Sequence, residues 1–226
     1  MADKAFLVNT LICTGCRSCQ TACKQWNSLP GETHSFFAGP EITNPGRLSA
    51  VTWTHVSFNP YKPGDGRRPL WDILHKKCFH CKDAACLRGC PERAIFRDDG
   101  WVLINQKKCT GCRQCTTLCP YTVPHVSTED HRDSSGGEII LKDKAYKCNA
   151  CMVNKRDVPA CVDNCLAGAI TYGHRLFMIK QANLLLEGIK KENPGAAIYG
   201  IKESGGLRVI LLLREKPENY GLPVPV

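Results

Sequence analysis

The sixteen cysteines of this 226-residue chain limit what it can fold into more than any other feature. They fall into four quartets, and none is left over. The quartets are Cys13, Cys16, Cys19 and Cys23; Cys78, Cys81, Cys86 and Cys90; Cys109, Cys112, Cys115 and Cys119; and Cys148, Cys151, Cys161 and Cys165. Cysteines bunched in this way indicate a metal protein, because disulfide-stapled scaffolds are short and spread their cysteines to cross-link distant loops.

The spacing within the quartets predicts four [4Fe–4S] clusters. The first and third quartets read C-x2-C-x2-C-x3-C, the second C-x2-C-x4-C-x3-C and the last C-x2-C-x9-C-x3-C. A [4Fe–4S] cubane presents four iron corners, each of which takes one thiolate. Two-residue gaps let a tight loop wrap three of these corners, and Gly15 and Gly111 suit such a loop because glycine tolerates positive φ.

The fourth cysteine of each quartet is expected to ligate a different cluster from the first three. In bacterial two-cluster ferredoxins it ligates the other cluster of the pair, and a proline follows it, as after Cys90 and Cys119 here. If the fourth cysteines are exchanged in this way, Cys90 serves the third triplet and Cys119 the second. Cys23 then serves the last quartet's cluster and Cys165 the first.

Structural zinc is the alternative reading of the cysteines. The last quartet alone could pass as two zinc knuckles. The first and third quartets crowd three ligands within seven residues, which suits a single ion poorly.

The net charge of +9 does not indicate a nucleic-acid partner. Each oxidised cluster with four thiolates carries formally about −2, so four clusters bring the holoprotein close to neutral. No folded nucleic-acid recognition motif accompanies the charge. Many cations stand beside the quartets, where they offset cluster charge and help to set reduction potentials. They are Lys24, Lys76, Lys77, Arg88, Lys107, Lys108, Arg113, Lys147, Lys155 and Arg156.

The order of the segments predicts an α+β fold with two ferredoxin-like domains. Apolar runs at 94–97 and 101–104, separated by Asp-Asp-Gly, predict a hairpin between the second and third quartets. Residues 73–125 form one domain. Residues 1–72 and 146–173 form the other, which holds the first and last quartets and an insertion at 24–72. Residues 126–145 are expected to be a linker loop, and 168–172 repeat the pattern of the segment after Cys90.

The remaining segments are a long insertion and a C-terminal extension. The insertion is expected to contain a strand at 48–58 between turn-rich stretches at 40–45 and 59–64. In the extension, 174–226, the pattern predicts a helix over 174–192, a hairpin of 197–202 and 207–213, and a proline-rich end. These segments either pack around the clusters or form a docking surface for other subunits.

No catalytic set is visible in the sequence. With four cysteines for every cluster, neither His80 nor His125 is needed as a ligand. All cysteines are committed, and no phosphate-binding glycine loop stands between a strand and a helix. The chain is expected to carry electrons rather than to make or break bonds itself.

Two segments resemble a known family. They are C-T-G-C-R-S-C-Q-T-A-C-K-Q-W-N at residues 13–27 and C-P-Y-T-V-P at residues 119–124. With the four quartets, they resemble the four-cluster electron-transfer (beta) subunits of molybdopterin oxidoreductases related to dimethyl sulfoxide reductase. The chain is most similar to the formate dehydrogenase beta subunits. The resemblance is strong over residues 5–173 and weak over the tail.

The resemblance implies a fold and a set of partners. The two ferredoxin-like domains would be related by a pseudo-twofold axis. A large catalytic subunit would carry a bis-pterin molybdenum or tungsten site and one further cluster. Electrons would pass from it through the terminal-quartet pair to the middle pair. An acceptor would follow: a cytochrome, a quinone-reducing membrane subunit, a ferredoxin or a flavoprotein.

The chain departs from the family in three places. Nine residues separate Cys151 from Cys161 where about two more are expected, and Leu166 stands where proline is usual. No apolar run is long enough to serve as the C-terminal transmembrane helix of membrane-anchored relatives. A soluble complex is therefore expected. It would be cytoplasmic by default, or periplasmic if a partner carries the subunit across the membrane.

Two other functions remain open from the sequence. The chain could be the equivalent subunit of another molybdopterin reductase or of a hydrogenase, because the sequence of an electron-transfer subunit does not indicate the substrate of its catalytic partner. It could also be a free-standing polyferredoxin. The long insertion and tail argue against the second alternative, since a minimal carrier needs neither.

Overall fold

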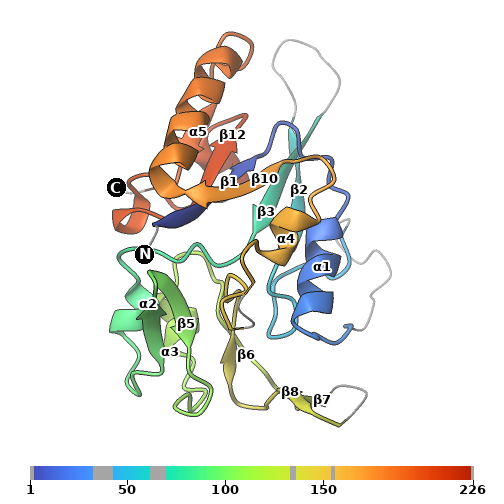
Figure 1. Cartoon of the computed structure of the whole chain (residues 1–226), viewed down its shortest axis with the longest axis vertical. Helices are drawn as coiled ribbons and strands as arrows, with labels where there is room; N and C mark the ends of the chain where they lie inside the picture. Colours follow the sequence, from blue (N-terminus) through green and yellow to red (C-terminus); the bar gives the residue numbers. More distant parts are fainter. Residues whose placement is uncertain (1–2, 33–42, 62–69, 133–135, 154–155, 225–226) are drawn as a thin grey trace.

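The computed structural model describes residues 3–32, 43–61, 70–132, 136–153 and 156–224 (Figure 1). The helices are α1 (Ser18–Trp26), α2 (Ala85–Arg88), α3 (Gln114–Leu118), α4 (Ala160–Asp163) and α5 (Arg175–Ile189), with 3-10 turns η1 (Glu203–Gly205) and η2 (Pro217–Tyr220). The strands are β1 (Lys4–Asn9), β2 (His55–Tyr61), β3 (Leu70–Lys76), β4 (Ile95–Asp98), β5 (Trp101–Ile104), β6 (His125–Val126), β7 (His131–Arg132), β8 (Glu138–Ile140), β9 (Ala145–Tyr146), β10 (Ile170–His174), β11 (Ala197–Tyr199) and β12 (Val209–Leu213). The mixed helix and sheet content predicted from the sequence is confirmed.

A four-stranded sheet with strand order β10-β1-β12-β11 unites the two ends of the chain. Strand β1 pairs antiparallel with β10 and parallel with β12, and β12 pairs antiparallel with β11. The two central strands, β1 and β12, are buried on both faces, which explains the unbroken apolar run of β12. One face packs on α5, through Ala5, Leu7, Met178, Ala182, Ile210 and Leu212. The other faces the central core, through Phe6, Val8, Val209, Leu211 and Leu213.

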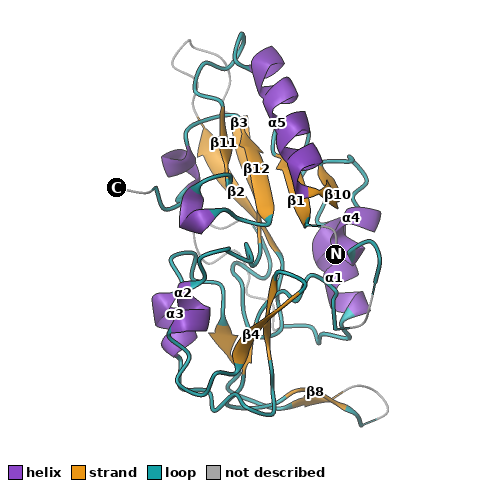
Figure 2. Cartoon of the chain, turned by 60° about the vertical axis from the view of Figure 1, so that its left-hand side comes forward, coloured by secondary structure: helices purple, strands orange, loops and turns teal. Residues whose placement is uncertain are grey.

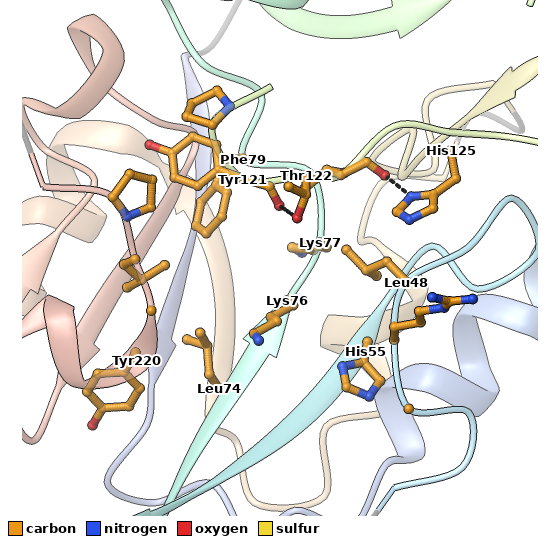
Figure 3. A pocket seen from close by; sticks show the side chains of 17 residues that line it. Leu48, His55, Leu74, Lys76, Lys77, Phe79, Tyr121, Thr122, His125 and Tyr220 are labelled. Carbon is orange, nitrogen blue, oxygen red and sulfur yellow. Dashed lines mark hydrogen bonds between the residues drawn. The ribbon is translucent and has the colours of Figure 1, made fainter. Parts of the chain in front are cut away.

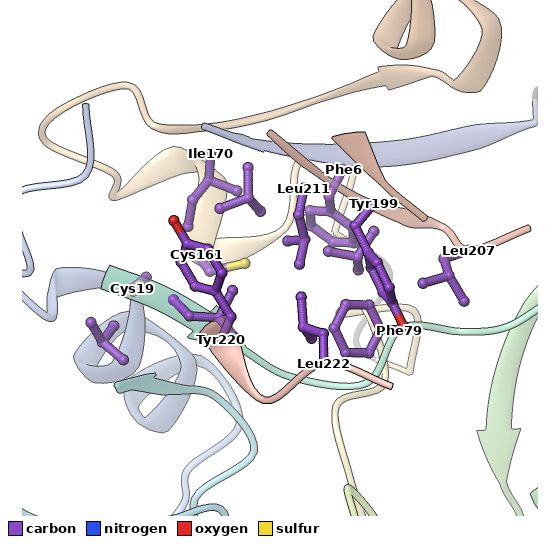
Figure 4. Packing of buried hydrophobic residues seen from close by; sticks show 14 of the residues in the cluster. Phe6, Cys19, Phe79, Cys161, Ile170, Tyr199, Leu207, Leu211, Tyr220 and Leu222 are labelled. Atoms are coloured by element: carbon purple, nitrogen blue, oxygen red, sulfur yellow. The ribbon is translucent and has the colours of Figure 1, made fainter. Parts of the chain in front are cut away.

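The central core connects this sheet with the cysteine-bearing loops. It contains Phe6, Phe79 and Tyr199 together with Cys19 and Cys161 (Figure 4). Trp101 is 1% exposed and packs edge-on against Phe6, with ring centroids 5.6 Å apart. The hydrophobic core and the sulfur-bearing loops are therefore one packed unit.

Two helix pairs lie next to the cysteine loops. Helix α1 contacts α4 beside the four-stranded sheet, and α2 contacts α3 beside the β4–β5 hairpin (Figure 2). The predicted hairpin at 94–104 is confirmed, with Asp98 opposite Trp101. Asp99 and Gly100 form its turn with φ of 42° and 79°, as a two-residue type I′ turn requires.

The insertion differs from the prediction. The strand expected at 48–58 begins only at His55, because Ser49 Oγ accepts hydrogen bonds from the amides of Val51 and Thr52 and holds these residues in a turn. Residues 59–61, predicted as a turn, continue β2, which pairs with β3, a strand that was not predicted. The expected turns at 40–42 and 62–64 lie outside the described residues.

The linker and the C-terminal segment are also more ordered than expected. Residues 126–145 contain the short pairs β6–β9 and β7–β8 rather than only a loop. The predicted C-terminal helix is confirmed as α5, and the hairpin as β11–β12, with shorter strands than expected. Within the described residues, no helix combines the length and apolar composition needed to cross a lipid bilayer.

Candidate metal centres

The structure brings the sixteen thiols together in four groups that do not follow the quartets. Two of the groups line small cavities. One cavity is lined by Cys90 together with Cys109, Cys112 and Cys115. The other is lined by Cys23 together with Cys148, Cys151 and Cys161. In both cavities the fourth cysteine of one quartet lies with three cysteines of another.

The remaining eight thiols show the same exchange. Cys165 and Cys16 lie close enough to Cys13 for their charges to raise its pKa, and Cys13 and Cys165 act in the same way on Cys19. The charges of Cys78, Cys119 and Cys86 likewise raise the pKa of Cys81. We name the groups I (Cys13, Cys16, Cys19, Cys165), II (Cys23, Cys148, Cys151, Cys161), III (Cys78, Cys81, Cys86, Cys119) and IV (Cys90, Cys109, Cys112, Cys115).

The loops of groups I and IV have the same local geometry because they share the sequence C-T-G-C-R. Gly15 and Gly111 have φ of 68° and 70°, and Arg17 and Arg113 both have φ of 64°. Each arginine precedes a helix, α1 or α3, that carries the third cysteine of the triplet. Glycine suits the second residue of each C-x2-C gap, because positive φ is costly for most residues that carry a Cβ. At Gly111 a Cβ would also collide with the backbone of Asp143.

Backbone amides point at several of the sulfurs. The amides of Ala94 and Ala145 lie 3.3 Å from the Sγ atoms of Cys90 and Cys109, both in group IV. The amide of Ala150 lies 3.4 Å from Cys148 Sγ in group II. Amide donors of this kind stabilise thiolates and the clusters they hold. A donor set of four thiols with inward amides fits a [4Fe–4S] cluster.

Single-ion sites fit less well. In the described ranges, no three or more His, Cys, Asp or Glu side chains converge closely enough to hold one metal ion. Zinc needs four ligands in a tight tetrahedron at about 2.0–2.3 Å. The spacing of the thiols around each group therefore favours a cluster over zinc.

Burial makes most of these thiols inert in the absence of metal. It raises the pKa to about 11 for Cys115 and to about 12 for Cys19, Cys81, Cys86 and Cys148. Thiols with such pKa values are protonated at neutral pH and are poor nucleophiles. A bound metal centre supplies the positive charge that ionises them. Cys16 differs, because it is exposed and hydrogen bonding with Ser18 lowers its pKa.

The four groups are neighbours in the order I, II, III and IV, and we call this series the line of thiol groups. Cys161 of group II raises the pKa of Cys19 in group I, and Cys78 of group III raises that of Cys148 in group II. Cys115 of group IV does the same to Cys86 in group III. The ends of this line reach the surface, because Cys16 in group I and Cys112 in group IV are exposed.

The surroundings of the two ends differ in chemistry. Near group I, Ile12 and Leu166 are 49% and 81% exposed, each next to a cysteine of the group. Around group IV the exposed side chains include the cations Lys107, Lys108 and Arg113. The group I end thus exposes two apolar side chains, and the group IV end exposes these three cations beside Glu92.

The two histidines considered as ligands make other contacts. His125 Nδ1 lies 2.9 Å from the carbonyl oxygen of Val123. His80 is fully buried, and its Nδ1 accepts a hydrogen bond of 3.2 Å from the amide of Val102. Burial, with the charges of Lys147 and Lys77, lowers the pKa of His80 well below its usual value. His80 is therefore a neutral packing residue.

A larger cavity of about 410 Å³ lies between the insertion, β3 and the C-terminal segment (Figure 3). Its lining includes Lys76, His55, His125 and Thr122, together with Pro120 and Tyr121, which directly follow Cys119. His55 Nε2 is hydrogen-bonded with Thr43 at 3.0 Å. The residues that line this cavity include no cysteine.

Comparison with known proteins identifies the class and then the family. Residues 12–95 and 69–175 each match a family model described as a 4Fe-4S dicluster domain. The fold and the thiol groups thus belong to a 4Fe-4S dicluster protein with ferredoxin-like domains. The chain is 32% identical over 98% of its length to the iron–sulfur subunit of the nitrate-inducible formate dehydrogenase from Escherichia coli (strain K12), of which it covers 73%.

Two other relatives have different names. A sulfite dehydrogenase subunit from Allochromatium vinosum is 29% identical over 99% of this chain and 84% of the relative. Hydrogenase-2 operon protein HybA from Escherichia coli O157:H7 is 28% identical over 96% of this chain and 72% of the relative. The chain belongs to the family of iron–sulfur subunits that includes those of formate dehydrogenases. It is an electron-transfer protein that binds 4Fe-4S clusters.

Proposed function

We propose that this chain relays electrons through four [4Fe–4S] clusters between a molybdenum or tungsten bis-pterin catalytic subunit and an external acceptor. Formate dehydrogenase is the complex we favour, because the formate dehydrogenase subunit is the relative of highest identity among the three described above. Groups I to IV would each hold one cluster, so that all sixteen cysteines are ligands. Each cluster supplies one-electron redox chemistry.

One observation carries this proposal: the four thiol groups form a single line with an exposed thiol at each end. A free-standing carrier needs one exposed redox site, whereas a relay between two partners needs one at each end. The thiols of group II are all buried and those of group III are buried or half-buried, so the two inner clusters would hold the electron largely away from solvent.

The chemistry of the two ends supports a direction for the partners. Exposed Ile12 and Leu166 at group I suit a permanent interface with the catalytic subunit, because obligate interfaces are rich in apolar side chains. The basic surface at group IV suits a transient acceptor, since charged surfaces favour fast and reversible encounter. Electrons would enter at group I and leave at group IV.

We also propose the pseudo-twofold relation and the domain division expected from the sequence. Residues 73–125 would form one domain, and 1–72 with 146–173 the other. The matching loops of groups I and IV and the helix pairs α1–α4 and α2–α3 support the relation. Strand β12 pairs with β1, so the extension 174–226 would be an integral part of the terminal-quartet domain as well as a docking element.

The test compares two assays of the same complex. Cys112→Ala removes the exposed ligand of group IV and should abolish electron delivery to the physiological acceptor. Formate oxidation with a dye that accepts electrons at the catalytic subunit should survive. Glu187→Ala, at an exposed position of α5 away from the thiol groups, should leave both activities intact. Equal loss of both activities in an intact Cys112→Ala complex would contradict the relay.

A second function, the same role in a sulfite dehydrogenase or a hydrogenase complex, is kept open by the relatives with those names. Purification of the tagged chain under anaerobic conditions distinguishes the two by the catalytic subunit that accompanies it. A pterin-containing subunit that oxidises formate supports the first function. A sulfite-oxidising or hydrogen-oxidising partner supports the second, and a chain that purifies alone supports a polyferredoxin. We propose a cytoplasmic location, with periplasmic location by co-export as the alternative.

A further inference from the structure

Two lysines are buried in the middle of the line of thiol groups. Lys77 is 0% exposed and Lys147 is 5% exposed. Each directly precedes the first cysteine of a quartet, Cys78 or Cys148. Within the described parts of the chain, no ion pair joins either lysine to a carboxylate. A buried ammonium group is costly unless negative charge or hydrogen bonds compensate it, so the source of that compensation matters.

The charge of Lys77 is compensated at group II, although Lys77 directly precedes Cys78 of group III. Its Nζ lies 3.5 Å from the Sγ atom of Cys161 and 3.0 Å from the centre of the Phe6 ring. Phe6 and Cys161 both belong to the central core (Figure 4). Burial raises the pKa of Cys148 and Cys151 in group II, and the charge of Lys77 offsets part of that rise. Lys77 acts in the same way on Cys19 of group I, which adjoins group II.

Lys147 does the reverse. It precedes Cys148 of group II, but its Nζ donates a hydrogen bond to the carbonyl of Val102 on β5, in the other half of the molecule. A second bond of 3.3 Å goes to the carbonyl of Cys148. Val102 belongs to a core cluster against which Cys81 and Cys86 of group III pack. Burial raises the pKa of Cys86 and Cys119, and the charge of Lys147 offsets part of that rise. Each lysine thus precedes a cysteine of one inner group in the chain, while its Nζ lies beside the other inner group.

The inner groups are where added negative charge is hardest to hold. Reduction adds one electron to a cluster that is already an anion, and burial in a medium of low dielectric penalises that added charge. Groups I and IV each have an exposed cysteine, so water screens them. All four cysteines of group II are buried, and those of group III are buried or half-buried. A positive charge acts roughly four-fold more strongly in the protein interior than in bulk water.

We propose that Lys77 and Lys147 are reciprocal tuning residues that raise the reduction potentials of the clusters at groups II and III, respectively. The reduced form of each inner cluster gains more from the nearby ammonium than the oxidised form does. Without this gain, an electron passing from group I to group IV would meet two steps of lower potential in the middle of its path. The inference rests on the proposed assignment of four clusters.

Redox titration of the purified full chain, followed by the electron paramagnetic resonance of the reduced clusters, tests the proposal. Lys77→Met should lower the potential of the group II cluster, and Lys147→Met that of the group III cluster. The expected change is at least about tenfold in the reduced-to-oxidised ratio at a fixed potential, or about 59 mV for one electron. Lys77→Arg and Lys147→Arg keep the charge and should restore much of the potential.

Two sets of reference variants assign the shifts. Cys23→Ala and Cys119→Ala each remove one ligand from group II or group III, so the altered signal identifies that group. Lys82→Met is the matched control, because Lys82 directly follows Cys81 but is exposed. Its charge is screened by water, and its replacement should leave every potential unchanged.

Unchanged potentials in both Met variants with full iron content would overturn the proposal. A shift of the same cluster in both variants, or of an outer cluster, would overturn the reciprocal arrangement. If one Met variant loses iron, the potentials of the other Met variant and of the two Arg variants still test whether the lysine charge raises the potential of an inner cluster. A wild-type chain that lacks four [4Fe–4S] signals would instead contradict the proposed function, so the two failures are distinguishable.

Discussion

The backbone carbonyl of Asp143 occupies the space where a side chain of Gly111 would begin. Gly111 lies in the loop between Cys109 and Cys112, and Asp143 lies 32 residues later in the chain, just before β9. This contact presses the linker against the loop of group IV. Lys144 strengthens it by donating a hydrogen bond to the carbonyl of Cys109.

Gly111→Ala should therefore destabilise the group IV centre. The positive φ alone costs roughly 1–2 kcal/mol for a residue with a Cβ, and the collision with backbone adds to this. The expected result is loss of one cluster, measured as a fall of about a quarter in iron content, or faster bleaching of the visible absorbance in air. Gly136→Ala is the control, because Gly136 has φ of 86° but nothing within 4 Å of its Cβ position. Equal effects of both variants would mean that backbone strain, rather than the contact with Asp143, is responsible.

Cys90→Ala should damage the group IV cluster and spare group III, although Cys90 belongs to the second quartet. The reason is that Cys90 lines the cavity of Cys109, Cys112 and Cys115. The expected product is a three-iron cluster in group IV, detected by electron paramagnetic resonance of the oxidised protein. Cys86→Ala, from the same quartet, should instead alter group III. Identical spectra for the two variants would show that the quartet closes on a single cluster.

Leu166→Glu should weaken binding of the catalytic subunit without changing iron content. Leu166 is 81% exposed beside Cys165, so a charge there meets the apolar interface proposed at group I. Co-purification from cells that express both subunits measures the effect. Phe96→Glu is the matched variant, because Phe96 is 40% exposed on β4, in the other half of the molecule. Loss of the partner in Phe96→Glu alone would reverse the proposed orientation.

Leu211→Ala should destabilise the sheet that joins the two ends of the chain. Leu211 is 0% exposed on β12 and faces the central core, and truncation of such a residue typically costs about 2–5 kcal/mol. The expected result is cluster loss at clearly lower denaturant concentration, followed by visible absorbance. Leu184→Ala on the exposed side of α5 should change the midpoint little, since surface substitutions stay within about 0.5 kcal/mol. A similar midpoint for both variants would mean that the sheet does not limit stability.

The sequence predicted the features that depend on local spacing. The identical C-T-G-C-R segments at residues 13–17 and 109–113 adopt the same backbone, and Asp99–Gly100 forms the expected turn. The α5 helix and the β11–β12 hairpin were also found from local patterns. In each case the residues that determine the local structure are close together in the chain, so the prediction does not depend on contacts with distant segments.

The sequence did not predict the features that depend on distant partners. Strand β3 contains Asp72 and His75, which break an apolar pattern, but Asp72 is buried and pairs with Arg214 at 3.5 Å. Parallel pairing of β1 with β12 joins residues about 200 positions apart, which no local pattern encodes. The sequence places Lys77 and Lys147 beside the quartets, but nothing in it indicates that they are buried or which group each one approaches.

Quantification of iron, acid-labile sulfide and zinc in the anaerobically purified chain tests the central claim most directly. Four groups of four thiols, each with one cubane, predict about 16 iron and 16 sulfide per chain and negligible zinc. A value near 12 iron would leave one group without a cluster and would break the proposed line. About four zinc ions with negligible sulfide would contradict the account as a whole.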